Sequence, residues 1–373
     1  YYLKHEEFLL FSSEIKVINR LSDELGIEIK KKVNLNALEN YLSYLYCPGE
    51  NTPLDNIKKV SPGEFIEISN KTNIQKYKWF SPPIILNKST KNNILDFNKT
   101  EYIKKTTSYI RKAVKRQMIS DVEVGAFLSG GIDSSLIVAF AKEINPNIKC
   151  FTIDLIGGND YGIENDLPYA KMVAKHFDVP LEIIKIDSKK VSNMLPWMIH
   201  QLDEPLADPA ALNVYFISKL ARQKGIKVLL SGAGGDDIFT GYRRHQAINA
   251  LNIFNIMPFE IRKLLSKLLL PYSNSKLFSK RLKKLFRSFK YDGNEQLVEM
   301  FKWISKNDLQ NILSYNTRNT LYGDGFIKDE MLNYLHNNFL KNSSKIRKIL
   351  ALEQRFFLGD HNLIYTDKMS MAA

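Results

Sequence analysis

Residues 129 to 135 combine small, hydroxyl-bearing and acidic side chains in a pattern that suits the binding of phosphate groups. The segment reads Ser129-Gly-Gly-Ile-Asp-Ser-Ser135. Its glycines permit a tight turn that brings backbone N–H groups close to an anion, and its serines add hydroxyl donors. Asp133 is the carboxylate that could hold a Mg²⁺ ion on the phosphates. We therefore predict a phosphate-binding loop here.

This loop lacks the lysine that phosphoryl-transfer loops use. A Walker-type loop carries Gly-Lys-Ser or Gly-Lys-Thr to hold the transferred γ-phosphate, and no lysine follows Gly131 at this spacing. Glycines, hydroxyls and one carboxylate instead suit the β,γ-pyrophosphate of ATP, held through Mg²⁺ as a leaving group. This composition predicts attack at the α-phosphate of ATP. A Gly-Gly turn between strand and helix without any ligand is the alternative interpretation.

A second segment of the same character occurs later in the chain. It reads Ser231-Gly-Ala-Gly-Gly-Asp-Asp237 and directly follows the apolar run from Ile226 to Leu230. Small residues after a buried strand, followed by carboxylates that open a helix, would present backbone donors and an acidic side chain to a nucleotide. Two such loops can face one Mg-ATP, so ATP and Mg²⁺ are the predicted ligands.

The elements that must position these loops alternate between strands and helices. The run from Val122 to Leu128 is short and apolar, which is typical of a strand covered on both faces of a parallel sheet, and a helix is expected from Leu136 to Lys142. The later elements are expected as strand 148–155, helix 168–177, strand 181–186, helix 212–223 and strand 226–230. Because strands separated by helices pair in parallel, we predict an α/β fold with a doubly wound sheet and a site beyond its carboxyl ends.

Residues 1 to 80 follow a different pattern, in which short apolar runs alternate with turns. The expected elements are strands at 8–11 and 65–68, a turn at 61–64 and a helix at 35–45. This region is therefore predicted to be a separate domain of mixed α and β structure.

A linker is predicted at residues 81 to 100, which mix Pro, Asn, Ser, Thr and Lys. A helix at 101–118 follows, with Tyr102 and Tyr109 on its less charged stripe. The predicted organisation is a domain at 1–80, the linker, and a second domain at 101–373.

Composition excludes several classes of protein. The chain has 373 residues, 44% of them hydrophobic, and contains no unbroken apolar stretch long enough to span a membrane. Cys47 and Cys150 stand alone, and the six histidines show no metal-ligand spacing, so disulfides and structural zinc are not expected. Because unpaired cysteines are typical of a reducing compartment, the predicted location is the cytoplasm.

The net charge of +13 is concentrated in one segment. Residues 262 to 290 contain ten Lys or Arg and no Asp or Glu. Leucines alternate with these charges at helical spacing, which predicts an amphipathic pair of helices interrupted at Pro271. A solvated basic face over a leucine core is one interpretation, and a surface for anionic lipid or RNA is the other. We favour the first and expect no nucleic acid partner.

The two loops resemble those of the N-type ATP pyrophosphatases, and the chain as a whole most resembles the glutamine-hydrolysing asparagine synthetases. Further family-like stretches are Phe11–Lys16, Tyr44–Gly49, Ser61–Glu64, Leu202–Ala210 and Gly359–Ala372. The resemblance implies an adenine-nucleotide alpha-hydrolase-like sheet, preceded by the C-terminal part of an α+β glutaminase domain of the N-terminal nucleophile type. It also implies that the cysteine nucleophile and a pyrophosphate-binding lysine lie outside this chain, so we expect a piece of a longer protein. Cys47 is not a candidate nucleophile.

The resemblance also assigns roles to individual residues. Asp133 and Asp236 correspond to the catalytic carboxylates that hold Mg²⁺ on the pyrophosphate. The positions that match nucleotide contacts are Leu128, Ser129, Gly130, Gly131, Asp133, Ser134, Ser135, Ile153, Ser231 and Gly232. The positions on the substrate side are Asp203, Glu204, Asp208, Ala233, Asp360 and Asp367, with Lys368 beside the last. For Asp203, Glu204 and Asp208, local capping and turn hydrogen bonding is the alternative role.

By resemblance, the predicted activity is the AMP-forming amidation of a carboxylate, aspartate to asparagine, with ammonia supplied by glutamine. A homodimer is compatible with this assignment. Asparagine synthetases usually carry glutamate, and many relatives aspartate, where this chain has Ala233. A relative that amidates another carboxylate, such as a sugar uronic acid in surface polysaccharide synthesis, therefore stays open.

Two rival classes of protein are also possible. A tRNA-modifying pyrophosphatase would need paired cysteines, and a pseudo-enzyme would not need both Asp133 and Asp236.

Overall fold

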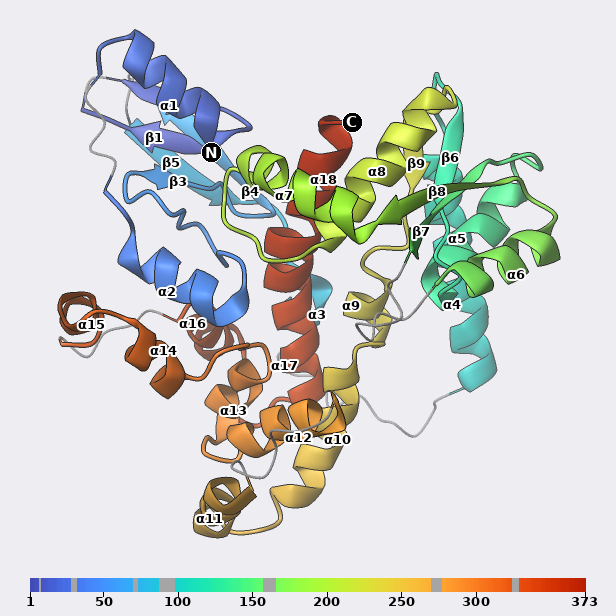
Figure 1. Cartoon of the computed structure of the whole chain (residues 1–373). Helices are drawn as coiled ribbons and strands as arrows, with labels where there is room; N and C mark the ends of the chain where they lie inside the picture. Colours follow the sequence, from blue (N-terminus) through green and yellow to red (C-terminus); the bar gives the residue numbers. More distant parts are fainter. Residues whose placement is uncertain are drawn as a thin grey trace. The chain divides into compact units, whose positions relative to one another are not determined.

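The part of the chain that carries both loops is built on a parallel sheet (Figure 1). In the computed structural model, the described residues are 1–6, 8–27, 32–69, 73–86, 98–156, 166–269, 277–323 and 329–373. They form two units, each made of separate stretches of chain. Unit 1 comprises Tyr1–Lys88, Asp203–Ala207 and Asp237–Leu363, and unit 2 comprises Ser89–Leu202, Asp208–Asp236 and Ile364–Ala373.

Unit 2 contains a four-stranded sheet in the order β8-β7-β6-β9, and every neighbouring pair is parallel. Its strands are β6 (Val124–Phe127), β7 (Cys150–Ile156), β8 (Leu181–Asp187) and β9 (Val228–Leu230). Its helices are α4 (Lys99–Gln117), α5 (Ile132–Lys142), α6 (Leu167–Phe177), α7 (Ser188–Leu202) and α8 (Ala210–Gln223). The predicted α/β class with a parallel sheet is confirmed.

Helices cover both faces of this sheet, because successive residues of each strand point to opposite sides. Ala126 of β6 and Cys150 of β7 pack into the cluster that α5 and α6 cover. Phe127 and Phe151, one residue further along each strand, pack into the cluster covered by α8. Figure 1 shows α5 and α6 on one side of the strands and α8 on the other. The apolar runs of the sequence therefore reflect burial on both faces.

The helix α4 packs through a different face from the one its sequence suggests. Tyr102 and Tyr109 are more than half exposed, whereas Ile110, Val114 and Met118 pack against the core of the sheet. The aliphatic stripe, spaced by four residues, is the buried one. The side of α4 that packs against the sheet is therefore not the side that carries the tyrosines.

Unit 1 contains antiparallel strands and most of the remaining helices. Its strands are β1 (Tyr2–Lys4), β2 (Leu9–Phe11), β3 (Ile57–Lys58), β4 (Glu64–Ser69) and β5 (Asn73–Lys78), paired as β2-β1-β3 and β4-β5. Its first helices are α1 (Ile15–Glu24), α2 (Leu35–Tyr44) and α3 (Pro83–Leu86). These elements confirm the β structure and the helix expected in residues 1–80. The predicted domain boundaries stay a prediction, and residues 87–97 of the expected linker lie outside the described residues.

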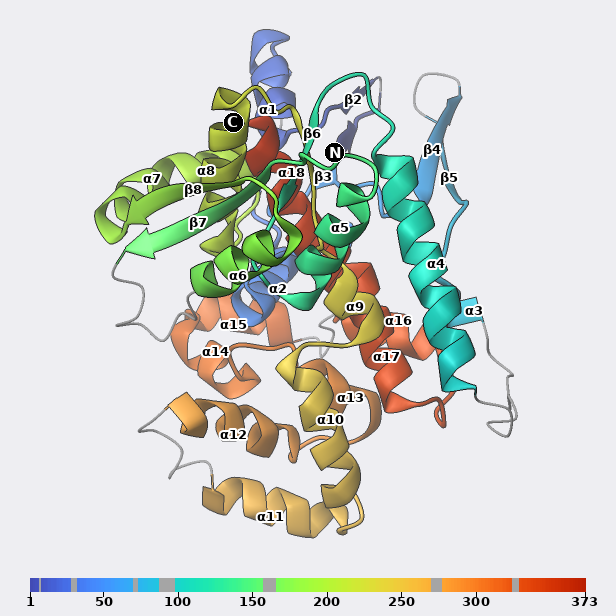
Figure 2. The ribbon, with the colours of Figure 1, turned by 90° about the vertical axis from the view of Figure 1, so that its right-hand side faces the viewer.

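The second half of unit 1 is helical (Figure 2). Its helices are α9 (Gly235–Phe239, which begins in unit 2), α10 (Arg243–Phe254), α11 (Phe259–Leu269), α12 (Leu277–Ser288), α13 (Gly293–Glu299), α14 (Lys306–Ile312), α15 (Tyr315–Tyr322), α16 (Glu330–Asn338) and α17 (Lys345–Leu352). The π-helix η4 (Glu353–Asn362) follows α17 in unit 1, and helix α18 (Leu363–Met371) belongs to unit 2 except for its first residue. The two helices expected in the basic segment are present as α11 and α12, although Pro271 lies outside the described residues. Within the described ranges, no helix is both long and apolar enough to cross a membrane.

Candidate functional site

The two predicted loops follow neighbouring strands at the point where the sheet reverses its order. The chain passes from β6 to β7 and β8 on one side, and then returns to place β9 on the other side of β6. Ligands of open parallel sheets bind beyond the carboxyl ends of the strands at such a switch point. The segments 129–135 and 231–236 begin directly after β6 and β9. The topology therefore brings the two loops together.

The first loop is held by its own serines. The Ser134 hydroxyl lies 3.0 Å from that of Ser129 and donates to the carbonyl of Gly131 at 3.2 Å. The Ser135 hydroxyl donates to the same carbonyl at 2.7 Å. These bonds form because α5 begins at Ile132, four residues earlier than expected, so that Asp133 lies in its first turn. The partly positive start of α5 thus faces the same region as the loop N–H groups.

Glycine is required at position 130 because of its backbone conformation and because of the atoms packed against it. Its φ is +81°, a left-handed conformation that side chains rarely adopt. A Cβ atom here would lie 2.4 Å from the backbone nitrogen of Ala170 in α6. The loop therefore packs directly against the first turn of α6, a contact that the sequence alone did not indicate.

The second loop packs against the Asp133 carboxyl group. A Cβ on Gly235 would lie 2.3 Å from Cγ of Asp133, and a Cβ on Gly232 would lie 2.7 Å from the backbone nitrogen of Ser134. Glycine at these positions lets the backbone of one loop approach the acidic side chain of the other. Sequence reasoning assigned no role to Gly235, although its place before two aspartates was a usable signal.

Asp133 and Asp236 interact electrostatically across this contact. Burial raises the pKa of the Asp133 carboxyl above its usual range, and the nearby negative charge of Asp236 raises this pKa further. A divalent cation between the two carboxylates would offset both effects. Mg²⁺ commonly takes one or two carboxylates and completes its shell with water and substrate phosphates, so this pair fits Mg²⁺. In the part of the chain that the structure describes, no group of three or more His, Cys, Asp or Glu is placed to hold a metal.

The remaining predicted nucleotide contacts lie on the same strands and loops. Leu128 is buried at the carboxyl end of β6, where its N–H donates to the carbonyl of Phe151 at 2.9 Å. Ile153 lies in β7, opposite Ile184 of β8. The Ser231 hydroxyl accepts the N–H of Ala233 at 3.1 Å, and the Ala233 side chain is exposed. All of these positions belong to unit 2.

Three of the predicted substrate-side residues belong to unit 1, and two of them hold its N-terminal segment. Asp203 has a φ of +60°, and its carboxylate accepts the N–H groups of Ile15 and Lys16 at 3.3 Å each, at the start of α1. Glu204 is buried and pairs with Lys59 at 3.0 Å. Its other oxygen accepts the Tyr1 hydroxyl at 2.6 Å. These partners are distant in sequence, so the contacts are not the local turn hydrogen bonds considered as the alternative role. The stretch 203–209 is not helical, as expected from Pro205 and Pro209.

The other substrate-side candidates are divided between the units. Asp208 accepts the N–H of Ala210 at 2.9 Å, where α8 begins, and Asp367 is exposed on α18 next to the buried Lys368. Asp360 is buried in unit 1, where it accepts the N–H of Gly49 at 2.7 Å. The structure therefore brings Asp133, Asp236 and Ala233 to one pair of loops, and gives Asp203, Glu204 and Asp360 partners within unit 1.

The π-helix η4 carries polar contacts that the sequence did not suggest. Arg355 pairs with Asp360 at 3.1 Å and donates to the Ser61 hydroxyl at 3.3 Å. The preceding residue is Gln354, and its amide donates to the backbone carbonyl of Asp237 at 3.1 Å. π-Helical turns are rare and occur frequently at functional sites. This one connects the residue after Asp236 with the stretch around Gly49 and Ser61.

Cys47 lies in a buried environment that keeps its thiol protonated. The side chain is 3% exposed, and its Sγ contacts the carbonyl oxygen of Ala37 at 3.7 Å. Burial and the charge of Glu204 raise the pKa of this thiol to about 12. Because the thiolate is the nucleophile, the geometry agrees with a packing role for Cys47.

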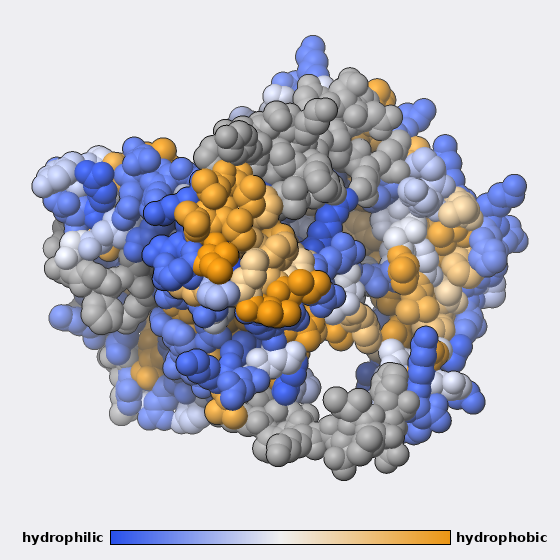
Figure 3. Space-filling model, turned by 90° about the horizontal axis from the view of Figure 1, so that it is seen from below, coloured by the Kyte–Doolittle hydropathy of each residue, from blue (hydrophilic) through white to orange (hydrophobic). Residues whose placement is uncertain are grey.

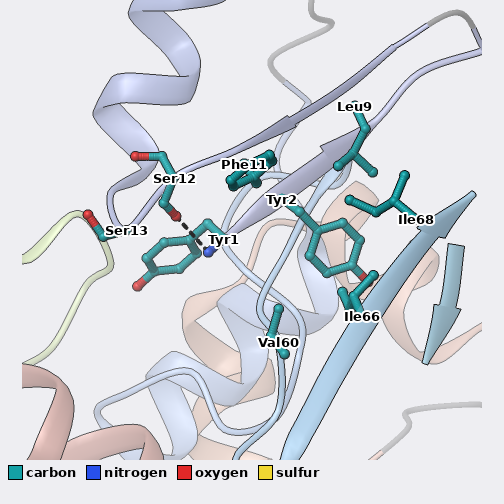
Figure 4. A pocket seen from close by; sticks show the side chains of 9 residues that line it. All are labelled: Tyr1, Tyr2, Leu9, Phe11, Ser12, Ser13, Val60, Ile66 and Ile68. Carbon is teal, nitrogen blue, oxygen red and sulfur yellow. Dashed lines mark hydrogen bonds between the residues drawn. The ribbon is translucent and has the colours of Figure 1, made fainter. Parts of the chain in front are cut away.

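A pocket of about 580 Å³ lies in unit 1 (Figure 4). Its walls come from β1, β2 and β4, and are mostly aliphatic and aromatic. Figure 4 shows Tyr2 and Ile66 side by side in it, with the Tyr1 nitrogen donating to the carbonyl of Ser12 at 2.8 Å. Among the described residues that line it there is no carboxylate, histidine or lysine, and its titratable side chains are those of Tyr1 and Tyr2.

Comparisons with known proteins match two parts of the chain to known families. Residues 105–373 match the family described as asparagine synthase, and residues 1–80 match the glutamine amidotransferase domain. The chain is 32% identical over 265 residues to glutamine-hydrolyzing asparagine synthetase 1 of Bacillus subtilis (strain 168). This matched region covers 71% of the chain and 39% of the relative. It is 29% identical over 201 residues to glutamine-hydrolyzing asparagine synthetase 2 of the same organism, covering 50% of the chain and 25% of that relative. The chain thus spans well under half the length of these two relatives.

Among solved structures, the chain is similar to an NH3-dependent NAD synthetase from Campylobacter jejuni, at 16% identity and a TM-score of 0.26, covering 67% of this chain and 96% of that one. This likeness is too low to add to the fold described above. The sequence matches are sufficient by themselves: with residues 105–373 matched to the family and a curated member 32% identical, the chain belongs to the asparagine synthase family.

Proposed function

We propose that this chain is the ATP-using part of a ligase that amidates a carboxylate and forms AMP and pyrophosphate. The observation that carries the proposal is the contact between Gly235 and Asp133, which places two carboxylates and two sets of loop N–H groups at one switch point. The absence of a Walker lysine after Gly131 argues against transfer of the γ-phosphate.

The reaction proceeds in two displacements. A carboxylate oxygen of the substrate attacks the α-phosphorus of ATP, and the bond to the bridging β-phosphate oxygen breaks, releasing pyrophosphate. The nitrogen of ammonia then attacks the acyl carbon, the bond to AMP breaks, and the amide forms with loss of a proton to solvent. Both steps develop negative charge on leaving phosphate groups, so a site that neutralises this charge accelerates them.

The residues of the two loops divide this task. The N–H groups around Gly130 and Gly131 and the start of α5 hold the departing pyrophosphate. Asp133 and Asp236 would hold Mg²⁺, which supplies charge neutralisation on the phosphate oxygens. Gly232 and Gly235 keep the second loop close enough for both carboxylates to serve one ion.

The carboxylate substrate is proposed to be aspartate, with a sugar uronic acid as the second candidate. The first rests on family membership. The second rests on Ala233, whose exposed methyl group offers no charge where asparagine synthetases usually carry glutamate. Ammonia is proposed to come from glutamine through a domain to which residues 1–80 belong. A cytoplasmic location and a homodimer complete the proposal.

The test is to supply the full-length enzyme with Mg-ATP, ammonia and either aspartate or a panel of uronic acids, and to identify the nucleotide formed. AMP and pyrophosphate with aspartate are expected. ADP and inorganic phosphate as the main products would contradict the mechanism, and AMP formed only with a uronic acid would transfer the assignment to the second candidate. Ala233→Glu is the companion variant, because a gain in aspartate-dependent AMP formation would locate the specificity in that side chain.

A further inference from the structure

Helix α11 buries two of its polar residues and exposes several of its aliphatic residues. Arg262 and Ser266 are buried at 3% and 0% exposure, whereas Ile261, Leu264 and Leu268 are 48%, 57% and 57% exposed. The predicted leucine core beneath a basic face is therefore wrong for α11. A helix on a protein surface normally buries its apolar stripe, so the exposure of the aliphatic residues of α11 calls for a structural explanation.

The cause is a polar contact that fixes the buried side of α11. The guanidinium of Arg262 donates to Oδ1 of Asn255 at 2.8 Å and pairs with Asp292 at 3.5 Å. Asn255 in turn donates to Gln296 at 2.9 Å. Because these groups hold one face of the helix against the body of unit 1, Leu264 and Leu268 on the opposite side are left outside.

Neighbouring aliphatic residues extend the exposed face of α11. Ile253 at the end of α10 is 69% exposed, and Ile256 in the following turn is 83% exposed. Figure 3 shows apolar surface gathered on the face of the molecule that carries these elements. We call the set Ile253, Ile256, Ile261, Leu264 and Leu268 the α11 patch. Contiguous exposed apolar surface of this kind marks interaction sites.

The charges beside the α11 patch select the kind of partner. Lys263 and Lys267 are exposed on α11, and Glu260 is the one acidic residue in the helix. Aliphatic side chains rimmed by lysines match a surface that is apolar within and anionic outside, which is a bilayer containing anionic lipids. RNA would engage the lysines but would leave the leucines and isoleucines without a role, because it stacks on aromatic or guanidinium planes.

We propose that the α11 patch docks the protein on the surface of an anionic membrane, with Leu264 and Leu268 entering the boundary between headgroups and acyl chains while Lys263 and Lys267 pair with lipid phosphates. The helix lies on the membrane and does not cross it. This proposal is independent of the amidation chemistry, since nothing in it involves the two loops of unit 2.

The experiment measures binding of the full-length protein to vesicles by co-sedimentation. Vesicles of equal parts phosphatidylglycerol and phosphatidylcholine should bind it at least about tenfold more tightly than vesicles of phosphatidylcholine alone, and added salt should weaken the binding. The variant Leu264→Ser with Leu268→Ser should lose about tenfold or more in affinity, as should Lys263→Glu with Lys267→Glu.

Two matched controls separate the patch from general surface properties. Ile312 and Leu340 are 63% and 61% exposed elsewhere in unit 1, so Ile312→Ser with Leu340→Ser should leave binding unchanged. Lys112 and Lys115 are exposed on α4, so Lys112→Glu with Lys115→Glu controls for net charge. Circular dichroism verifies that each variant is folded. If the variant with both leucines replaced does not fold, the variant with both lysines replaced still tests the proposal.

Several results would overturn the proposal. These are no binding to anionic vesicles, binding that the leucine variant retains, or equal losses in the control variants. A dimer in solution that the leucine variant converts to monomer, without any vesicle binding, would make the α11 patch a contact between copies of the chain. Salt-sensitive RNA binding that depends on the lysines but not on the leucines would assign the surface to nucleic acid.

Discussion

At the scale of single residues, the proposed site contains two carboxylates, Asp133 and Asp236, whose negative charges repel each other. The pKa of Asp133 is raised by burial and by Asp236, so folding favours its protonated form. A carboxyl group whose pKa is raised in the folded state contributes most to stability below its usual pKa, and this contribution is lost as pH rises through the folded value. At neutral pH the pair therefore costs stability that ligand binding can offset.

The first prediction concerns Asp236→Asn. Removing one charge should lower the pKa of Asp133 toward its usual range and raise the free energy of unfolding at neutral pH by about 0.5 kcal/mol, since solvent screens the half-buried pair. The same variant should form AMP at least about a hundredfold more slowly, because a ligand of the ion is lost. Urea denaturation and a pyrophosphate-release assay measure the two effects. Reduced stability with unchanged turnover would show that the pair is structural.

The second prediction concerns the two thiols, both of which are buried and have a pKa of about 12. At pH 8 only roughly one thiol in 10⁴ would be ionised, so iodoacetamide should label neither Cys47 nor Cys150 in the folded protein. Labelling in urea is the control. Both thiols should also lower stability as pH rises from about 9 to 12, because the unfolded chain ionises first. Rapid labelling of native Cys47 would reopen its candidacy as a nucleophile.

At the scale of elements, the sequence was a good guide wherever apolar residues are buried on both sides. Four strands and the helices α6 and α8 were predicted close to their observed bounds, because period and length distinguish them, whereas α5 begins four residues earlier than expected. The loops at 129–135 and 231–237 were also predictable, since glycine, serine and aspartate after a strand have few other uses. The order of the strands in the sheet could not be predicted from the sequence, because either edge of the sheet could have paired with β9.

Other elements depend on contacts between distant residues, which local patterns do not contain. The outward orientation of Leu264 follows from the bond between Arg262 and Asn255, and nothing in the heptad-like spacing of the leucines reveals it. Asp203 and Glu204 belong to a family-like stretch, yet their partners are Ile15, Lys16 and Lys59. Their position before Pro205 allowed a turn to be predicted, but not the contacts with the N-terminal segment.

The third prediction concerns the π-helix η4. Arg355 and Asp360 are 13% and 5% exposed, so removing either partner leaves a charge largely out of water. Asp360→Leu should lower the free energy of unfolding by about 3 kcal/mol. Asp360→Leu combined with Arg355→Met should cost less than the sum of the single changes, which a double-mutant cycle in urea would measure. Additive costs would mean that the pair does not interact.

At the scale of the whole molecule, the two units are not consecutive in sequence. Each of the three stretches that form unit 1 is followed along the chain by a stretch of unit 2. Residues 1–88 are held within unit 1 by the buried pair Lys59–Glu204 and by the contacts of Gly49 and Ser61 with η4. Cutting the chain after α3 would therefore not free an independent domain.

The fourth prediction tests this arrangement by introducing a protease site between Leu86 and Asn98. After cleavage, the two fragments should elute together from a size-exclusion column and separate only in denaturant, because buried polar pairs and apolar contacts hold them. An uncleaved sample and a sample cleaved after denaturation are the controls. Fragments that separate in native buffer would show that residues 1–86 pack only weakly on the rest of unit 1.

The pair Lys59–Glu204 also has a consequence for how the protein forms on the ribosome. Lys59 is synthesised long before its partner, and it is 7% exposed once the unit is complete. Burying an ammonium group without its counter-ion is costly, so the segment around β3 cannot reach its final packing while Glu204 is still untranslated. The N-terminal segment therefore waits for a large part of unit 2 to emerge, and chaperones have a defined interval in which to bind its exposed apolar residues.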